Sequence, residues 1–401
     1  MAKVADYVII GSGVVGVSIG SELLRRDPQR RVVILEKEPS AGLHASGRNS
    51  GVIHAGFYYS PDSLKARLTR DGNSQLREFA KSRGLRIQNS GKVVVAQNAK
   101  DVPKVHDLYS RGIANGVEVE VVTALELQKL EPLASTHEVA LWSPNTGVGD
   151  PMEFMREFTK EFVELGGEIS YGTLVKSVDD NRLDTSAGEF HAGHIINASG
   201  LYADKIAAIF GFGSRYTMLP FLGLYIYAPK LKGTLKRHIY PTPDPRNPFL
   251  GVHLTTTVDG SVKVGPTAIP VLSREQYSLT SGFHAREFLE ILGTYPKFAL
   301  SPHHDVISLL RTELPKLSRR VLVRQAKKLA PSIKLEDFTQ VGKPGIRAQL
   351  FDLKDRKLEM DFVVEGDAHS THVLNAVSPA WTSCISFSKF VVDQMQEKGA
   401  A

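Results

Sequence analysis

A glycine-rich turn near the start of the chain limits the folds that this sequence can adopt. Gly11, Gly13 and Gly16 form a G-x-G-x-x-G pattern between the apolar run YVII at 7–10 and a segment with helical spacing. A second apolar run, VVIL, follows at 32–35. A strand, a glycine turn, a helix and a second strand in this order are typical of a parallel nucleotide-binding sheet. Such a turn lets the backbone approach a pyrophosphate, and the free amides at the helix start bind its oxygens.

An acidic residue follows the second apolar run. Glu36 lies 20 residues after Gly16, where a carboxylate accepts hydrogen bonds from ribose hydroxyls. An acid at this position disfavours a phosphorylated ribose, so NADP is not expected. The glycine pattern alone also fits a simple turn in another α/β protein. The strand before it, the helix after it, the second strand and the acid together favour a dinucleotide site.

Composition excludes several classes of function. The 401 residues include 49 Lys and Arg and 43 Asp and Glu, giving a net charge of +6 that suits anionic small molecules or an anionic surface. We find no zinc-spaced Cys/His set and no basic stripe with aromatics, so neither a metal nor a nucleic acid is expected. The single cysteine, Cys384, excludes an intramolecular disulfide and lies in an apolar run. No apolar run is long enough to span a membrane, and a strand pattern begins almost at the first residue, so a cytoplasmic protein is expected.

The order of the remaining segments predicts two interleaved domains of an α/β protein. A helix is expected from Pro151, with Asp150 as its N-cap, and another over 380–397. Residues 217–270 alternate as strands do, whereas 280–335 have helical spacing. We therefore expect a discontinuous Rossmann-like domain with an inserted β-rich α+β domain for the substrate. The predicted nucleotide-binding domain comprises 1–85, 145–212 and 338–401, and the predicted substrate domain comprises 86–144 and 213–337.

Six segments between residues 9 and 383 resemble a known family. They read IIGSGVVG, SGRNSGVIHAGFYYSPDSLKARL, INASGLYAD, YPTPDPRNPFLGVHLT, GIRAQL and NAVSPAWTS. They are similar to FAD-dependent oxidoreductases of the D-amino-acid-oxidase superfamily, and most of all to L-2-hydroxyglutarate dehydrogenases. The resemblance implies FAD as cofactor and oxidation of a small 2-hydroxy acid, L-2-hydroxyglutarate favoured, to its 2-oxo acid. It implies hydride transfer to flavin N5, with the electrons then passing to a quinone, another acceptor or oxygen.

The same resemblance implies which residues contact FAD. Segment 46–51 is expected to run along the flavin, and the amides that begin the last helix would stabilise the reduced ring. Val175 is expected to meet the adenine through its backbone. The full set of expected cofactor-binding residues is Gly11, Gly13, Val14, Val15, Gly16, Glu36, Lys37, Ser46, Gly47, Arg48, Asn49, Ser50, Val175, Ala198, Ser199, Gly200, Gly345, Ala380, Trp381 and Thr382.

Four residues are candidates for the chemistry. His54 is the expected base for the substrate hydroxyl, because imidazole titrates near neutral pH. It could instead be a structural histidine or, as in some relatives, a covalent tether for the flavin. Arg347 matches a motif arginine of the family and is suited to bind a carboxylate with two hydrogen bonds, although a surface ion pair is the common alternative. Tyr225 and His253 are expected to line the same pocket, with Thr255 and Lys263 ranked below them.

The chain departs from the resemblance at two places, which leaves the substrate open. Many 2-hydroxyglutarate dehydrogenases carry an arginine where this chain reads PFLGLY at 220–225, and another where it reads TTTVDG at 255–260. A shorter 2-hydroxy acid, or one with an apolar tail, therefore remains an alternative. So do an amine or amino-acid oxidase, a glycerol-3-phosphate dehydrogenase, and a flavin-binding module without turnover, since one scaffold supports several chemistries.

A basic segment suggests contact with a membrane. Residues 316–334 contain seven Lys or Arg and no acid, and Leu322, Ala326 and Leu329 share one helical face. Such a segment predicts peripheral contact with the anionic inner face of a membrane, which suits electron delivery to a quinone. A solvated basic face is the alternative. The sequence carries no signal of an oligomeric state.

Overall fold

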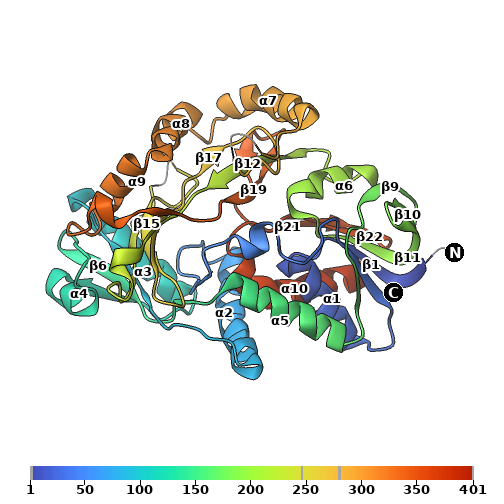
Figure 1. Cartoon of the computed structure of the whole chain (residues 1–401), viewed down its shortest axis with the longest axis horizontal. Coiled ribbons are helices and arrows are strands. Elements are labelled where there is room, and N and C mark those ends of the chain that lie inside the picture. The colour runs from blue at the N-terminus through green and yellow to red at the C-terminus, as the bar shows by residue number, and fades with distance from the viewer. Residues whose placement is uncertain (1–2, 245–246, 279–280, 400–401) are drawn as a thin grey trace.

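The structure is a computed structural model that describes residues 3–244, 247–278 and 281–399. Figure 1 shows two regions side by side: a sheet with helices α1, α5 and α10 near both termini, and a β-rich region that carries α7, α8 and α9 on its outside. The proline-rich sequence YPTPDPRNP at 240–248 begins inside strand β14 (His238–Pro241), and its residues 245–246 lie outside the described part.

The first region is built on a mixed eight-stranded sheet with β1 at its centre. The strand order is β21-β22-β11-β1-β2-β8, and β10 and β9 extend it from β11. β1 pairs in parallel with β2 and β11, and β22 pairs in parallel with β11. Strands buried on both faces read as continuous apolar runs, which explains YVII and VVIL. The bounds are β1 Lys3–Ile10, β2 Val32–Leu35, β8 Glu168–Ser170, β9 Val175–Asp179, β10 Arg182–Thr185, β11 Gly188–Asn197, β21 Val363–Gly366 and β22 Ser370–Asn375.

Helices cover both faces of this sheet. On one face α1 contacts α5 and α10, and α10 contacts α2; on the other, α6 contacts β11 and β22. The bounds are α1 Val14–Arg26, α2 Leu64–Arg83, α5 Pro151–Glu164, α6 Ala203–Ile209 and α10 Ala380–Glu397. Asp150 caps α5 as predicted, accepting hydrogen bonds from two amides of its first turn, and the helix predicted over 380–397 is confirmed. Cys384 is buried in the core between these helices, and burial raises its pKa to about 12.

The second region contains two sheets. The larger has the order β18-β13-β16-β15-β14-β4-β6-β5, and the smaller β17-β12-β19-β20. Their strands are β4 Lys92–Val95, β5 Glu120–Thr123, β6 Val139–Ser143, β12 Tyr216–Gly223, β13 Ile226–Ala228, β14 His238–Pro241, β15 His253–Thr256, β16 Val262–Gly265, β17 Ile269–Pro270, β18 Gln340–Val341, β19 Gly345–Asp352 and β20 Lys357–Leu358. β19 belongs to the segment predicted for the nucleotide-binding domain yet pairs with β12. The predicted two-domain division remains a prediction.

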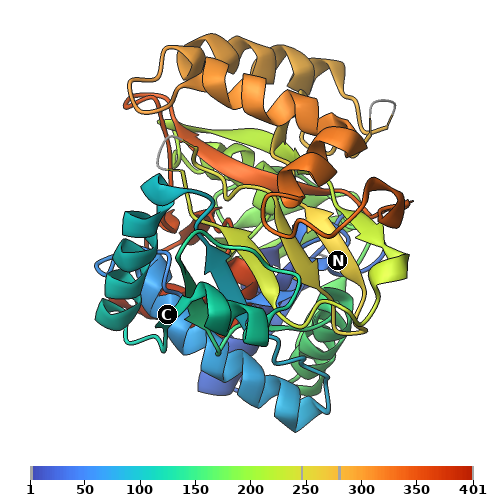
Figure 2. The same ribbon diagram turned by 90° about the vertical axis from the view of Figure 1, so that its left-hand side faces the viewer.

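Helices flank the second region. Figure 2 shows α7, α8 and α9 as a layer on one side of the molecule, over the strands of this region. The bounds are α3 Val102–Ala114, α4 Ala124–Leu130, α7 Ala285–Ala299, α8 Val306–Glu313 and α9 Arg319–Ala326. A short antiparallel two-stranded sheet is formed by β3 (Val52–Ile53) and β7 (Gly147–Val148). Among the described residues, no helix is both long and apolar enough to cross a membrane.

Candidate active site

A cavity of about 460 Å³ lies between the two regions. This volume is within the range of small-molecule sites. The glycine turn, the loop at 42–50 and the start of α10 form one side of it, and residues of β12, β14, β15 and β19 form the other. The predicted catalytic residues His54, Tyr225, His253 and Arg347 all line it. All the predicted cofactor-binding residues line it as well, except Gly16 and Gly47.

Each of the three motif glycines is required for a different structural reason. Gly11 has a φ of +106°, and a Cβ there would lie 2.7 Å from the carbonyl oxygen of Ala198. A Cβ at Gly16 would lie 2.0 Å from the carbonyl oxygen of Gly11, so this glycine permits close packing of helix on strand and does not face the cavity. Gly13 is the N-cap of α1 and lines the cavity. The turn therefore leaves backbone, rather than side chains, at the place where a pyrophosphate would lie.

Hydrogen bonds hold the Glu36 carboxylate beside the glycine turn. Its carboxylate accepts hydrogen bonds from the amide (2.8 Å) and hydroxyl (2.7 Å) of Ser12, and from the amide of Glu38 (2.9 Å). The residue is 8% exposed and lines the cavity. A carboxylate has about four lone-pair positions, so one remains for a ribose hydroxyl. The predicted role for Glu36 fits this arrangement.

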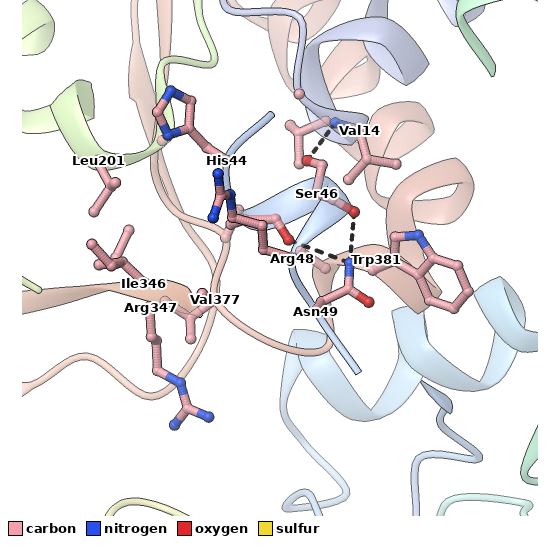
Figure 3. Close-up of a pocket in the computed structure, with 18 of the residues that line it drawn as sticks. Val14, His44, Ser46, Arg48, Asn49, Leu201, Ile346, Arg347, Val377 and Trp381 are labelled. Carbon is pink, nitrogen blue, oxygen red and sulfur yellow. Dashed lines mark hydrogen bonds between the residues drawn. The ribbon is translucent and has the colours of Figure 1, made fainter. Parts of the chain in front are cut away.

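The polar side chains of loop 45–50 mainly bind the protein's own backbone (Figure 3). The hydrogen bonds are Val14 N to Ser46 Oγ (2.9 Å), Asn49 Nδ2 to Ser46 O (2.7 Å), Arg48 Nε to Leu43 O (2.6 Å) and Arg48 Nη1 to Pro344 O (3.1 Å). They fix the conformation of a loop that lines the cavity. Gly47 points away from the cavity, because a Cβ there would lie 2.2 Å from Sδ of Met152.

The start of α10 offers free amides to the cavity. The helix begins at Ala380 without a side-chain cap, and Ala380, Trp381 and Thr382 line the cavity. The first amides of a helix have no partner within it and lie at its positive end. Trp381 Nε1 is buried and has no hydrogen-bond partner among the described residues. With the glycine cradle and Glu36 at the far end of the cavity, these open donors fit FAD: phosphates at the glycine turn and an electron-rich ring near α10.

His54 reaches the cavity from a fixed backbone. Its amide donates to Thr382 Oγ1 (3.1 Å), and its carbonyl accepts from Asn73 Nδ2 (2.9 Å). Burial lowers the pKa of the imidazole well below its ordinary value of 6.5, and the nearby charge of Lys92 and the rings of His253 and His238 act in the same direction. His54 is therefore neutral at pH 7, which is the form that accepts a proton.

Arg347 brings a cation without an anionic partner to the cavity. It lies on β19 opposite Phe221, and its guanidinium carbon is 4.8 Å from the ring centre of Phe249. Burial lowers its pKa against the smaller opposing effects of Tyr225, Tyr59 and Glu313, and among the described residues no carboxylate lies within ion-pair distance of it. A buried guanidinium without a counter-ion is unfavourable, and a bound carboxylate removes that cost. The structure thus places Arg347 inside a pocket, where the alternative of a surface ion pair does not apply.

The larger sheet of the second region presents a polar face inward. Side chains alternate along strands, so residues that pair across strands share a face. His238 pairs with Lys92 and Thr255 with Lys263, whereas their neighbours Ile239, Leu254 and Val264 point to the other face, against α9. The residues of the polar face are Lys92, His238, Tyr240, His253, Thr255 and Lys263, all buried.

Tyr240 and His253 are the residues by which this polar face reaches the cavity. Both line it, and their rings stack with centres 3.8 Å apart. His253 Nδ1 binds the carbonyl of Gly251 (2.9 Å), and burial is the main cause that lowers its pKa to about 3. The sequence interpretation missed Tyr240, Lys92 and His238. The alternation in HIYP at 238–241, with polar residues at every second position, is the signal that could have found them.

Neither Leu222 nor Thr256, which lie in the two segments where the family resemblance implies an arginine, bears a charge. Leu222 on β12 is buried in a small apolar cluster with Leu201, Ile269 and Ile346. Thr256 on β15 is also buried, and its amide donates to Nδ1 of His238 (3.3 Å). The charges that these arginines would supply must come from other residues if the substrate needs them.

Comparisons with known proteins find similar sequences over nearly the whole chain. The sequence profile of the DAO family, described as FAD dependent oxidoreductase, matches residues 6–394. The L-2-hydroxyglutarate dehydrogenase of Escherichia coli (strain K12) is 35% identical, covering 98% of this chain and 93% of that protein. The mitochondrial L-2-hydroxyglutarate dehydrogenase of Homo sapiens is 33% identical, covering 98% of this chain and 89% of that protein.

Solved structures confirm the predicted fold class. A dithionite-reduced L-α-glycerophosphate oxidase from Mycoplasma pneumoniae, with FAD bound, superposes with a TM-score of 0.79 at 21% identity, covering 98% of this chain and 95% of that one. A glycine oxidase from Geobacillus kaustophilus gives a TM-score of 0.74 at 18% identity, covering 99% and 96%. Identities this low show the shared fold alone.

Proposed function

Since this chain belongs to the family of FAD-dependent oxidoreductases, we propose that it oxidises a small 2-hydroxy acid, L-2-hydroxyglutarate first of all, to the 2-oxo acid. Relatives named for L-2-hydroxyglutarate match it over nearly its whole length. The observation that carries the proposal is the pairing of a neutral imidazole, His54, with an unpaired guanidinium, Arg347, in one cavity with the FAD cradle. A hydroxy acid needs both a proton acceptor and a carboxylate partner.

The residues of this chain divide the chemistry between them. Bound FAD supplies the acceptor for the hydride that leaves C2 of the substrate. Arg347 binds the C1 carboxylate with two N–H donors and so fixes the orientation of C2. A ring nitrogen of His54 takes the proton of the C2 hydroxyl as the carbonyl forms. Apolar walls at Phe221, Leu250 and Ile346 exclude water from the reacting atoms.

The main alternative is an amine or amino-acid oxidase on the same scaffold, because fold alone does not decide the substrate. We expect 2-hydroxy acids to yield one 2-oxo acid per two electrons transferred, and amino acids or sarcosine to yield no ammonia or other amine product. Assays of 2-oxo acid and of ammonia after turnover with an artificial electron acceptor test this. Ammonia released from amino acids at rates above those with hydroxy acids would contradict it.

We also propose that the α7–α9 layer contacts an anionic membrane, where a quinone could take the electrons. The apolar face predicted for 316–334 is wrong as a membrane face, since Leu322, Ala326 and Leu329 pack against the sheet below. The layer instead exposes other apolar side chains, namely Leu289, Leu292, Leu300, Ile307, Leu314 and Leu317. Residues 283–334 contain ten Lys or Arg and four Asp or Glu, a net +6 that equals the charge of the whole chain. A layer that combines positive charge with exposed leucines is suited to bind an anionic lipid surface.

Charge reversal at exposed positions of α9 and its continuation tests this contact. We expect the triple change Arg320→Glu, Arg324→Glu and Lys328→Glu to weaken binding to phosphatidylserine-containing vesicles by about a hundredfold or more, since each basic residue near such a surface contributes about 1 kcal/mol. A matched reversal of exposed lysines on the other region, Lys81, Lys160 and Lys176, should leave vesicle binding unchanged. Wild-type protein that ignores anionic vesicles in a co-sedimentation assay would remove the membrane proposal and leave a protein partner as the occupant to seek.

A further inference from the structure

Lys92 is a buried cation that the chemistry described so far does not use. The residue is 0% exposed on β4, and its Nζ has no hydrogen-bond partner among the described residues. Three aromatic rings surround this nitrogen: the ring centres lie 4.4 Å away for Tyr240, 5.1 Å for Tyr58 and 5.3 Å for Phe57. Aromatic faces attract an ammonium group but do not replace a counter-ion. Burial lowers the pKa of Lys92 to about 7.

Other buried lysines of the chain have partners that Lys92 lacks. Lys263, on the same face of the sheet, donates to the carbonyl of Ser50 (3.0 Å). Lys316 forms an ion pair with Glu313. Lys65 lies in the field of Asp361, which raises its pKa against the effect of burial. In the described part of the chain no carboxylate acts on Lys92 in this way.

The charge of Lys92 reaches the substrate end of the cavity. Tyr240, the ring closest to Nζ, lines the cavity and stacks on His253. Of the charged groups that lower the pKa of His54, Lys92 has the largest effect, and it also acts on His253. Two cations that form no ion pair with a described carboxylate therefore lie at this end of the cavity: Arg347 in its wall, and Lys92 outside it, behind the ring of Tyr240.

We propose that Lys92 is a specificity determinant that makes this site prefer a 2-hydroxy acid with two carboxylates over one with a single carboxylate. This inference rests on the proposed function and names its substrate class. A monocarboxylate satisfies Arg347 and leaves the ammonium form of Lys92 without a counter-ion, whereas a dicarboxylate also stabilises that ammonium form. Lys92 would thus supply the positive charge that Leu222 and Thr256 do not. A fixed charge in a partly buried site acts on a second charge several ångströms away strongly enough to change affinity about tenfold or more.

Binding of the two 2-oxo acids tests the proposal without turnover. The affinities of the FAD-loaded protein for 2-oxoglutarate and for 2-oxovalerate, which has the same carbon chain without the distal carboxylate, are measured by calorimetry. We expect the wild type to bind 2-oxoglutarate at least tenfold more tightly. Lys92→Met should remove most of that preference and change the affinity for 2-oxovalerate by less than about threefold. Lys92→Arg, which keeps the charge, should keep most of the preference.

The outcomes separate the possible roles. Equal weakening of both ligands in Lys92→Met would make Lys92 a structural residue, and an unchanged preference would place recognition of the distal carboxylate elsewhere; either overturns the proposal. Flavin content and melting temperature report on folding, and Lys92→Gln replaces Lys92→Met if the latter fails to fold. Wild-type protein that binds neither oxo acid would count against the proposed function itself, which distinguishes that failure from failure at Lys92.

Discussion

Replacing His54 by alanine should slow the anaerobic reduction of the bound flavin by substrate at least a hundredfold and leave FAD in place. General-base catalysis by a positioned imidazole contributes about 10²–10⁴-fold, and the imidazole forms no hydrogen bond to the cofactor loop among the described residues. Its backbone, by contrast, is tied to Thr382 and Asn73, and those hydrogen bonds survive the change. Stopped-flow absorbance of the flavin measures the rate, and flavin content after gel filtration measures retention.

The pH dependence of the same rate gives a second expectation for His54. Burial lowers its pKa below 6.5, so the neutral imidazole persists as pH falls through neutrality and is lost only when pH drops through that lowered pKa. The acidic limb of the wild-type rate profile should therefore lie below pH 6.5. His137→Ala, a change at an exposed histidine, is the matched control and should behave as wild type. A His54→Ala protein with unchanged reduction would exclude His54 as the base, and one without flavin would make it structural.

Changing Arg347 should affect the substrate and spare the cofactor. We expect Arg347→Met to raise the substrate concentration for half-maximal flavin reduction by about two orders of magnitude, because losing one partner of a buried charge pair costs about 2–5 kcal/mol. Arg347→Lys should be intermediate, since an ammonium group cannot form two parallel hydrogen bonds to one carboxylate. Anaerobic titration of the flavin spectrum measures both variants.

The control for Arg347 is Arg86→Lys, at an exposed position away from the cavity, which should leave the substrate dependence unchanged. Arg347 lines the cavity together with its neighbours on β19, Ile346 and Ala348. The substitution changes only the side chain at position 347 and leaves these neighbours in place. Loss of FAD in Arg347→Lys, with little change in substrate dependence of the remaining holoprotein, would assign Arg347 to folding of the cofactor site.

The parts of the fold that depend on local sequence were predictable. The glycine turn, the N-cap at Asp150 and the helix from Ala380 each follow from residues within one or two turns of each other. Segment 46–51 was expected beside the flavin from the family resemblance. Its hydrogen bonds, however, go largely to its own backbone and to Pro344, which a reading of the sequence cannot place.

The parts that depend on pairing across long distances were not predictable. Lys92 lies beside His238 only because β4 pairs with β14, two strands far apart in the sequence. The cluster of buried polar groups behind the cavity follows from that register, which no local pattern determines. The stripe of Leu322, Ala326 and Leu329 was found by its helical period, but periodicity does not tell whether a stripe faces a membrane or a sheet, and here it faces a sheet.

Anaerobic bleaching of the bound flavin by a panel of small molecules tests the central claim most directly. The panel contains L- and D-2-hydroxyglutarate, lactate, malate, glycerol 3-phosphate, sarcosine and several D-amino acids. The proposed function predicts complete loss of the oxidised flavin spectrum with L-2-hydroxyglutarate, faster than with any other member of the panel. Bleaching by an amine or by glycerol 3-phosphate, with no response to any 2-hydroxy acid, would contradict it.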